Sequence, residues 1–351
     1  MIGFLLLLSA AVPALMIRLI DSLIGKPFWP GRILAAVAAF SAPLTSHSGT
    51  LYPSVLGAVL VLVGSILFVE ATKTERTRLL VVSAVPWALT GVFHHAYFLL
   101  SLGYLICLAV LFGRRIPKGV LVVYAVVHGG WLALSYVVGG DAMTGTLPGG
   151  IDLEYVLNQV SYHLFDQDHG LLTNTPVILL YLTSWPVVYW LRGRLPSFAL
   201  KFLFVANSVT GLTLISYCFN GITPGESSIS RYFVPVIPLA VLVVVYLGYH
   251  LLSWLVVSAG AVGVSAVIGA MSLVTSCRVT SCHPLVEEQV SAALGSFDPL
   301  RVAGNFKSWS LLMAYFSTLI LSAFVPLVLL TRLFEPFLFV QKLVRAPASA
   351  D

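Results

Sequence analysis

Two aspartates and two histidines gather in one short segment and form the first candidate for chemistry. Asp166 and Asp168 lie between His163 and His169 in the stretch YHLFDQDHGLLTNTPVILL. Paired carboxylates can bind a divalent cation such as Mg²⁺ or Mn²⁺, and one of them can act as a general base. The alternative interpretation is an acidic loop whose aspartates cap the helix that follows and face water.

Arg231 is the second candidate. It directly precedes Tyr232 in FNGITPGESSISRYFVPVIPL, where a polar stretch gives way to an apolar run. A guanidinium group at such a position can bind phosphate through two parallel hydrogen bonds. The alternative is an arginine that snorkels to the membrane surface and fixes the end of a helix.

Two further histidines lie at the ends of apolar runs. His94 adjoins His95, and two successive residues of a helix point in different directions, so the pair is a poor joint metal site. Packing at the membrane interface is the favoured interpretation of His94, with ligand binding or acid–base chemistry as the alternative. His47 lies on the same predicted side and could extend a polar pocket.

Cys277 and Cys282 lie five residues apart in SCRVTSCHP, which we predict to be a polar loop. Such a pair could close a small disulfide if the loop faces an oxidising compartment. Two free thiols are the equal alternative. A zinc site is not favoured, because only His283 adds a ligand nearby.

The elements that would position these residues are transmembrane helices. Hydrophobic residues make up 58% of the 351 residues and charged residues only 9%, against about 25% charged in soluble domains. The composition therefore predicts an all-α, polytopic integral membrane protein with about eleven transmembrane helices. The predicted spans are residues 2–20, 32–47, 52–70, 79–94, 96–112, 120–138, 175–191, 202–218, 232–249, 254–273 and 310–331.

Charge in the connections predicts an orientation. Lysine and arginine cluster in every second connection, which the positive-inside rule assigns to the cytoplasm. The N-terminus is then outside and the C-terminus cytoplasmic. Residues 1–331 form one transmembrane domain and residues 332–351 a short cytoplasmic tail. Most acidic residues fall in the predicted outer loops near 139–174, 219–231 and 274–309. The net charge is +5, but the lysines and arginines lie in short clusters between apolar runs, where they orient a membrane protein. We therefore expect no nucleic-acid partner.

Three segments resemble one enzyme group, the GT-C-type membrane glycosyltransferases that use polyprenyl-phosphate sugars. Its members include dolichyl-phosphate-mannose protein mannosyltransferases and aminoarabinose transferases. The segments occur in the expected order and cover about residues 40–240. The matching positions are Phe165, Asp166, Gly170, Leu171, Leu172 and Pro176; then Arg231, Tyr232, Pro235 and Pro238; and, more weakly, the stretch 39–62.

The resemblance implies transfer of a sugar from a polyprenyl-phosphate carrier to an acceptor on the non-cytoplasmic face. Arg231 would bind the carrier phosphate, and the two aspartates would line the same cavity. Tyr232, His163, His169, His94 and His47 would complete the substrate site. In that group the key acid usually lies on a first outer loop, which the predicted topology does not contain. We therefore expect a preceding span to be missing, with Asp166, Asp168 or Glu154 replacing the acid.

Other functions stay open on the sequence. The chain could be a catalytically inactive relative, or a subunit that binds a lipid-linked glycan together with a partner chain. It could also transport lipids or solutes. The lack of a row of acidic residues within the spans lowers the case for a transporter. The expected location is the plasma membrane of a prokaryote, in contact with the lipid bilayer.

Overall fold

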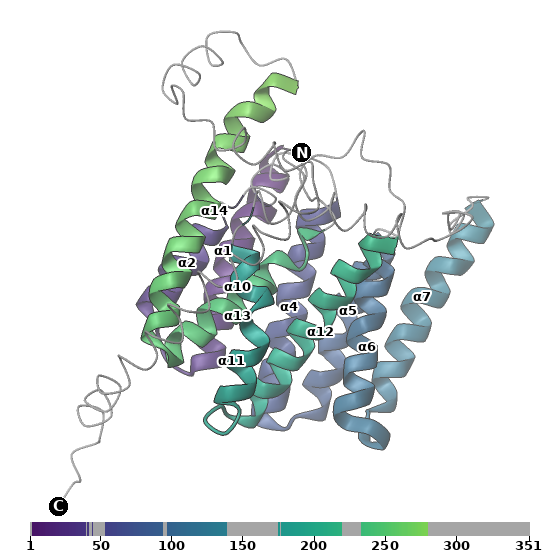
Figure 1. Ribbon diagram of the computed structural model, residues 1–351. Coiled ribbons are helices and arrows are strands. Elements are labelled where there is room, and N and C mark those ends of the chain that lie inside the picture. The colour runs from purple at the N-terminus through teal and green to yellow at the C-terminus, as the bar shows by residue number, and fades with distance from the viewer. Residues whose placement is uncertain are drawn as a thin grey trace, which may run out of the picture.

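The described residues of the computed structural model form a bundle of helices (Figure 1). They comprise residues 2–39, 41, 44, 53–93, 97–138, 175, 177–219 and 233–279, and no strand occurs among them. The helices are α1 (Ile2–Ile24), α2 (Trp29–Ala38), α4 (Pro53–Thr74), α5 (Thr77–Phe93), α6 (Phe98–Phe112), η2 (Gly113–Arg115), α7 (Lys118–Val138), α10 (Val177–Leu182), α11 (Ser184–Leu191), α12 (Ser197–Phe219), α13 (Ile237–His250) and α14 (Leu252–Val279).

Most helices follow the predicted spans, but α2 ends at Ala38, whereas the span predicted there continues to residue 47. Each of the first ten spans overlaps a helix, and span 175–191 contains both α10 and α11. The eleventh, 310–331, lies outside the described residues. Among the described residues, five helical stretches are long and apolar enough to cross a bilayer: Leu7–Ile24, Ser54–Thr74, Phe98–Arg115, Lys118–Val137 and Ser197–Ile215. The architecture is consistent with a helical membrane protein, and the number of crossings stays a prediction.

Helix α14 corrects one predicted boundary. It continues to Val279, whereas the span was predicted to end at residue 273 and an outer loop to begin at 274. Polar residues near its end do not stop a helix whose backbone groups bond to one another, and neither glycine nor proline interrupts residues 271–279. Cys277 therefore lies in the last turn of α14 and not in a loop.

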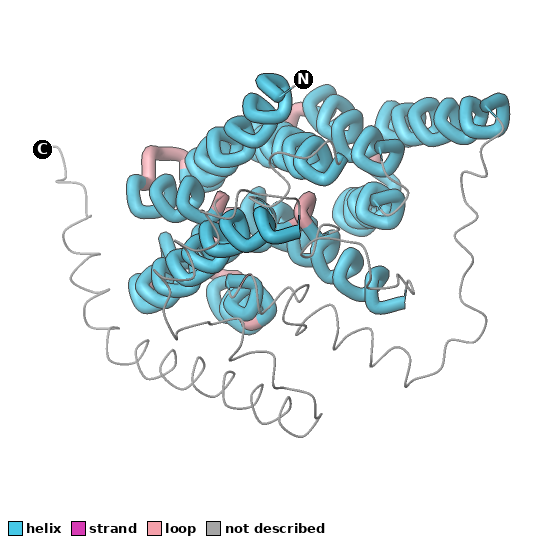
Figure 2. The backbone as a smooth tube through the Cα atoms, turned by 90° about the horizontal axis from the view of Figure 1, so that it is seen from above, coloured by secondary structure: helices cyan, strands magenta, loops and turns pink. Residues whose placement is uncertain are grey.

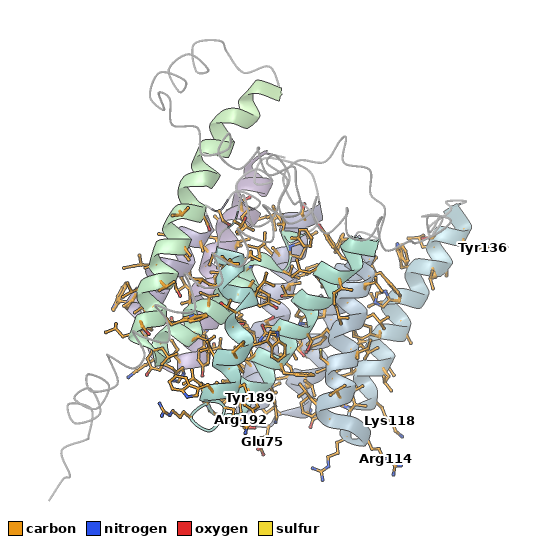
Figure 3. All side chains as sticks on the ribbon, viewed as in Figure 1. Glu75, Arg114, Lys118, Tyr136, Tyr189 and Arg192 are labelled. Carbon is orange, nitrogen blue, oxygen red and sulfur yellow. The ribbon has the colours of Figure 1, made fainter. Side chains whose placement is uncertain are left out.

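Charged residues of the described chain gather at one end of the bundle, which we call the basic end. It comprises the turns after α1, α4, α6 and α11, and Figure 3 shows Glu75, Arg114, Lys118 and Arg192 together there. Tyr136, near the end of α7, lies at the opposite end. Among the described Asp, Glu, Lys and Arg residues, only Arg278 belongs to the opposite end.

Helix α13 occupies the centre of the bundle. Every residue from Ile237 to Gly248 is buried, on all sides of the helix. It packs against α1, α2, α4, α10, α11, α12 and α14, and Figure 2 shows the bundle from above. The indole Nε1 of Trp254 donates a hydrogen bond to the carbonyl of Val244 at 3.0 Å, which ties α14 to α13. A helix that is apolar all round is the kind that can fill such a centre.

The outward-facing side of the bundle is also apolar. Val110 on α6 is 65% exposed, Val126 on α7 is 66% exposed and Val256 on α14 is 65% exposed. Soluble proteins rarely expose large contiguous apolar surfaces, because apolar groups in contact with water are unfavourable. With charge confined mostly to the basic end, this surface matches the hydrocarbon of a bilayer.

Candidate functional site

The residues predicted to carry chemistry lie outside the described residues. They are Asp166, Asp168, Glu154, Arg231, Tyr232, His163, His169, His94, His47 and Cys282. Their roles, including the metal site and the Cys277–Cys282 disulfide, stay predictions. Within the described chain, Cys107 is buried and forms no disulfide.

The structure does place the helix ends that adjoin these residues. Helices α4, α6, α10 and α13 begin at the end opposite the basic end, and α5 ends there. These are the helices that directly follow or precede the segments with the candidate histidines, aspartates and arginine. The described helix ends that flank the undescribed candidate segments therefore lie at one end of the bundle.

A close packing contact joins two of the segments that the sequence analysis singled out. A Cβ atom on Gly57 of α4 would lie 3.1 Å from Cγ of Pro235 and 3.4 Å from Cε2 of Tyr97. These spacings leave little room for a side chain, so glycine allows α4 to approach both residues. Gly57 belongs to the segment 39–62, and Pro235 lies four residues after Arg231.

The described helix at the end of the aspartate-containing segment, α10, packs against the central helix α13. Helix α10 also contacts α14. The backbone N–H of Val177 donates to Oγ of Ser265 at 3.1 Å, and that hydroxyl donates to the carbonyl of Ala261 at 2.8 Å. Because the first N–H groups of a helix lack partners within it, Ser265 satisfies one of them and fixes the start of α10.

Helices α10 and α11 form one interrupted helix. The interruption lies at Thr183, three residues before Pro186. Proline has no N–H to donate, and its ring displaces the carbonyl four residues earlier, here that of Leu182. The hydroxyl of Thr183 donates to the carbonyl of Leu180 at 2.9 Å, which satisfies one backbone group beside the break.

Polar groups that have no hydrogen-bond partner among the described residues lie near this interruption. Tyr181 donates its hydroxyl to the backbone carbonyl of Asn207 at 3.1 Å. Asn207 is 1% exposed, and neither its amide nitrogen nor its amide oxygen has a hydrogen-bond partner among the described residues. The hydroxyl of Ser184 is also buried without a described partner. These groups can hold water or a small polar ligand, but they include no acid or base for sugar transfer.

His128 is a second polar group within the bundle. Its Nε2 lies 3.2 Å from Oγ of Ser101, while the hydroxyl of Tyr124 donates to the carbonyl of Ser101 at 2.8 Å. Gly91 makes room for this cluster, because a Cβ there would lie 2.8 Å from Cε1 of the imidazole. The ring also packs edge-on against Phe98, with centroids 5.2 Å apart. The arrangement joins α5, α6 and α7 and fits a packing role.

No protein-family model matches this chain, and neither a curated protein nor a solved structure matches it. Among the described residues, no three His, Cys, Asp or Glu side chains gather where they could hold a metal ion. The carboxylates predicted to do so, Asp166 and Asp168, belong to the part of the chain that is not described.

Sequence reasoning did not single out Asn207 or His128. A signal existed for both, since each interrupts an otherwise apolar helix: Asn207 lies near the middle of α12, and His128 lies in α7. Polar groups within a membrane helix usually face the protein interior, because hydrocarbon offers no hydrogen bonds. The partners of such residues depend on neighbouring helices, which the sequence alone does not assign.

Proposed function

We propose that this protein is a membrane glycosyltransferase of the GT-C type, which transfers a sugar from a polyprenyl-phosphate carrier at the end opposite the basic end. The contact of Gly57 with Pro235 carries the proposal, because it joins two segments that resemble the family. Helix α10, which directly follows the candidate aspartates in the chain, packs on α13 and further supports the proposal. By the positive-inside rule the opposite end faces away from the cytoplasm.

The proposed reaction is a displacement at the anomeric carbon. An acceptor hydroxyl attacks this carbon, the bond to the carrier phosphate breaks, and polyprenyl phosphate leaves with the bonding electrons. One carboxylate of Asp166, Asp168 or Glu154 accepts the hydroxyl proton as general base. Arg231 stabilises the departing phosphate through charge-assisted hydrogen bonds. Asp166 and Asp168 are also the carboxylates that would hold a divalent cation.

Transport of a lipid or solute is the second candidate, and the interrupted helix favours it. Transporters often bind their substrates near the bilayer midplane at discontinuous helices. Here Tyr181, two residues before the break at Thr183, donates to the carbonyl of Asn207, whose buried amide has no hydrogen-bond partner among the described residues. This function needs the polar groups inside the bundle, whereas sugar transfer needs Arg231 and the aspartates.

Sugar transfer can be measured with the purified chain in liposomes. The donors would be a panel of labelled polyprenyl-phosphate hexoses and aminoarabinose, with a membrane extract as the source of acceptors. We expect Arg231→Ala, and the double variant of Asp166→Asn with Asp168→Asn, to abolish transfer while the folded protein remains. Arg114→Ala, at the basic end, is the matched control and should retain transfer.

Two outcomes would contradict the proposal. Transfer that persists in Arg231→Ala would remove the arginine from the phosphate site. Movement of the labelled lipid across the bilayer without any transfer, and lost in Asn207→Leu, would favour the transporter instead.

A further inference from the structure

A hollow of about 310 Å³ opens at the basic end, between α1, α2 and α4. It lies at the far end of the bundle from the proposed sugar site and plays no part in it. Its charged lining residues are Arg18, Asp21, Lys26, Arg32, Glu70 and Lys73. Four cations thus face two carboxylates, so the hollow has a surplus of two positive charges.

One of the two carboxylates is already paired. The Nη2 and Nε atoms of Arg32 donate to the carboxylate of Asp21 at 2.6 and 3.0 Å. The guanidinium also lies over the ring of Trp29, 5.0 Å from its centroid. These contacts fix Arg32 as part of the wall. Among the described residues that line the hollow, Glu70 is then the only other carboxylate that could balance the remaining cations.

Those remaining cations have no counter-ion among the described residues. Arg18, Lys26 and Lys73 form no ion pair there, since the salt bridge found in this part of the chain joins Arg32 to Asp21. Both lysines lie near aromatic rings: Nζ of Lys26 is 5.9 Å from the ring centroid of Tyr249, and Nζ of Lys73 is 5.7 Å from that of Phe198. The three side chains are therefore available to an anion from outside.

The backbone brings two of these cations to the same edge of the hollow. Gly25 ends α1 with φ of +78°, and its N–H donates to the carbonyl of Asp21 at 2.8 Å. This left-handed conformation is the usual way to end a helix at glycine. A Cβ on Gly25 would lie 3.8 Å from Nζ of Lys73, so the α4 lysine reaches across to the end of α1 beside Lys26.

A simpler explanation is that the cations complement helix dipoles. Helices α1 and α4 both end at the hollow, and carbonyl groups at helix ends attract positive charge. Cations that only complement helix dipoles would need neither a hollow nor a surplus of positive charge inside it. The two explanations also predict different responses to an added anion.

We infer that this hollow binds the phosphate group of an anionic ligand. Lysine and arginine are the side chains that bind phosphate, and basic pockets between membrane helices are typical sites for anionic lipid head groups. A lipid head group and a soluble phosphate share this chemistry. Glu70 restricts the site by repelling anions that approach too close to its carboxylate.

Binding can be followed through the thermal unfolding of the purified full chain. One arm compares nanodiscs of phosphatidylcholine alone with nanodiscs that also contain phosphatidylglycerol. A second arm adds inorganic pyrophosphate to the protein in detergent. The variant is Lys26→Gln with Lys73→Gln, and the control is Arg114→Gln with Arg115→Gln, which removes the same charge from a turn of the basic end outside the hollow.

We expect an anion to raise the unfolding temperature of the wild type and the control, but not of the lysine variant. Each cation near an anionic surface contributes roughly a fivefold gain in affinity, so the variant should bind on the order of 25-fold more weakly. A response to phosphatidylglycerol alone assigns the site to a lipid, and an equal response to pyrophosphate assigns it to soluble phosphate. The inference would be overturned if the lysine variant and the control lost the anion-induced rise in unfolding temperature equally, or if the wild type showed no such rise.

Discussion

Asp21 and Arg32 join the first two helices through a forked ion pair. Nη2 of Arg32 lies 2.6 Å from Oδ2 of Asp21, and Nε lies 3.0 Å from Oδ1. The side chain of Arg32 is only 25% exposed and that of Asp21 only 19%. The pair bridges the tight turn after Gly25, so it holds α2 against α1 where the chain reverses direction.

We expect Asp21→Asn to loosen this helical pair. Asparagine keeps the size of the side chain but removes the charge that attracts the guanidinium, so the midpoint of thermal unfolding in detergent should fall. Glu75→Gln is the control, because Glu75 is exposed and forms no ion pair among the described residues. Combining Asp21→Asn with Arg32→Gln should cost less than the sum of the single changes. Additive effects would show that the two residues do not interact.

Gly64→Ala should destabilise the contact between α4 and α5. A Cβ on Gly64 would lie 2.5 Å from Cδ1 and 2.7 Å from Nε1 of Trp87. The indole cannot move away, because it is fully buried and stacks on Tyr104 with ring centroids 4.6 Å apart. Overpacking of this kind costs about 1–3 kcal/mol of unfolding free energy.

The matched control for that change is Gly129→Ala on α7. A Cβ there has no heavy atom within 4 Å, and alanine favours a helix over glycine by about 0.5–1 kcal/mol. The midpoint of thermal unfolding should therefore fall in Gly64→Ala and should not fall in Gly129→Ala. A similar fall in the unfolding midpoint of both variants would mean that the close approach of Gly64 to Trp87 is not the cause of the destabilisation.

Asn207→Leu should leave stability unchanged or raise it. The amide has no hydrogen-bond partner among the described residues, so its removal loses no bond and relieves the cost of burying a polar group. Tyr181→Phe removes the hydrogen bond from the hydroxyl to the Asn207 carbonyl and should cost about 0.5–1.5 kcal/mol. A clear loss of unfolding free energy in Asn207→Leu would show that the amide binds water or a ligand.

Single cysteines should report the two ends of the bundle from opposite sides of the membrane. In a chain whose four natural cysteines are replaced by alanine, Lys118→Cys should react with an impermeant maleimide only after the cells are opened. Asp152→Cys, in a predicted outer loop, should react in intact cells. Because the basic end defines the orientation, reaction of both positions from the same side would remove the proposed sugar–phosphate site.

The sequence was a good guide to the helices. Apolar runs predicted where α4, α6, α7 and α12 lie, because each run is long and its polar boundaries are sharp. The prediction was less accurate where polar residues continue a helix, as at the end of α14. It also did not indicate the break at Thr183, because the effect of Pro186 depends on how the neighbouring helices support the chain.

The candidate site was predictable only in part. Residue types and spacing singled out Arg231 and the aspartates. The main support for their proposed roles is their position in the sequence. The sequence did not pair Asp21 with Arg32, or Gly57 with Pro235. The second contact joins residues that are far apart in the chain, and its short distances follow from helix packing that no local pattern encodes.

By itself the sequence determined that the chain is apolar and helical and that its basic residues alternate between connections, because composition and periodicity are local properties. Only the tertiary structure decided that α13, one apolar helix among many, lies at the centre with every side buried from Ile237 to Gly248. It also decided that cations from α1, α2 and α4 share one hollow. Both results depend on which faces of the helices meet, and several arrangements bury apolar side chains equally well until specific contacts select one.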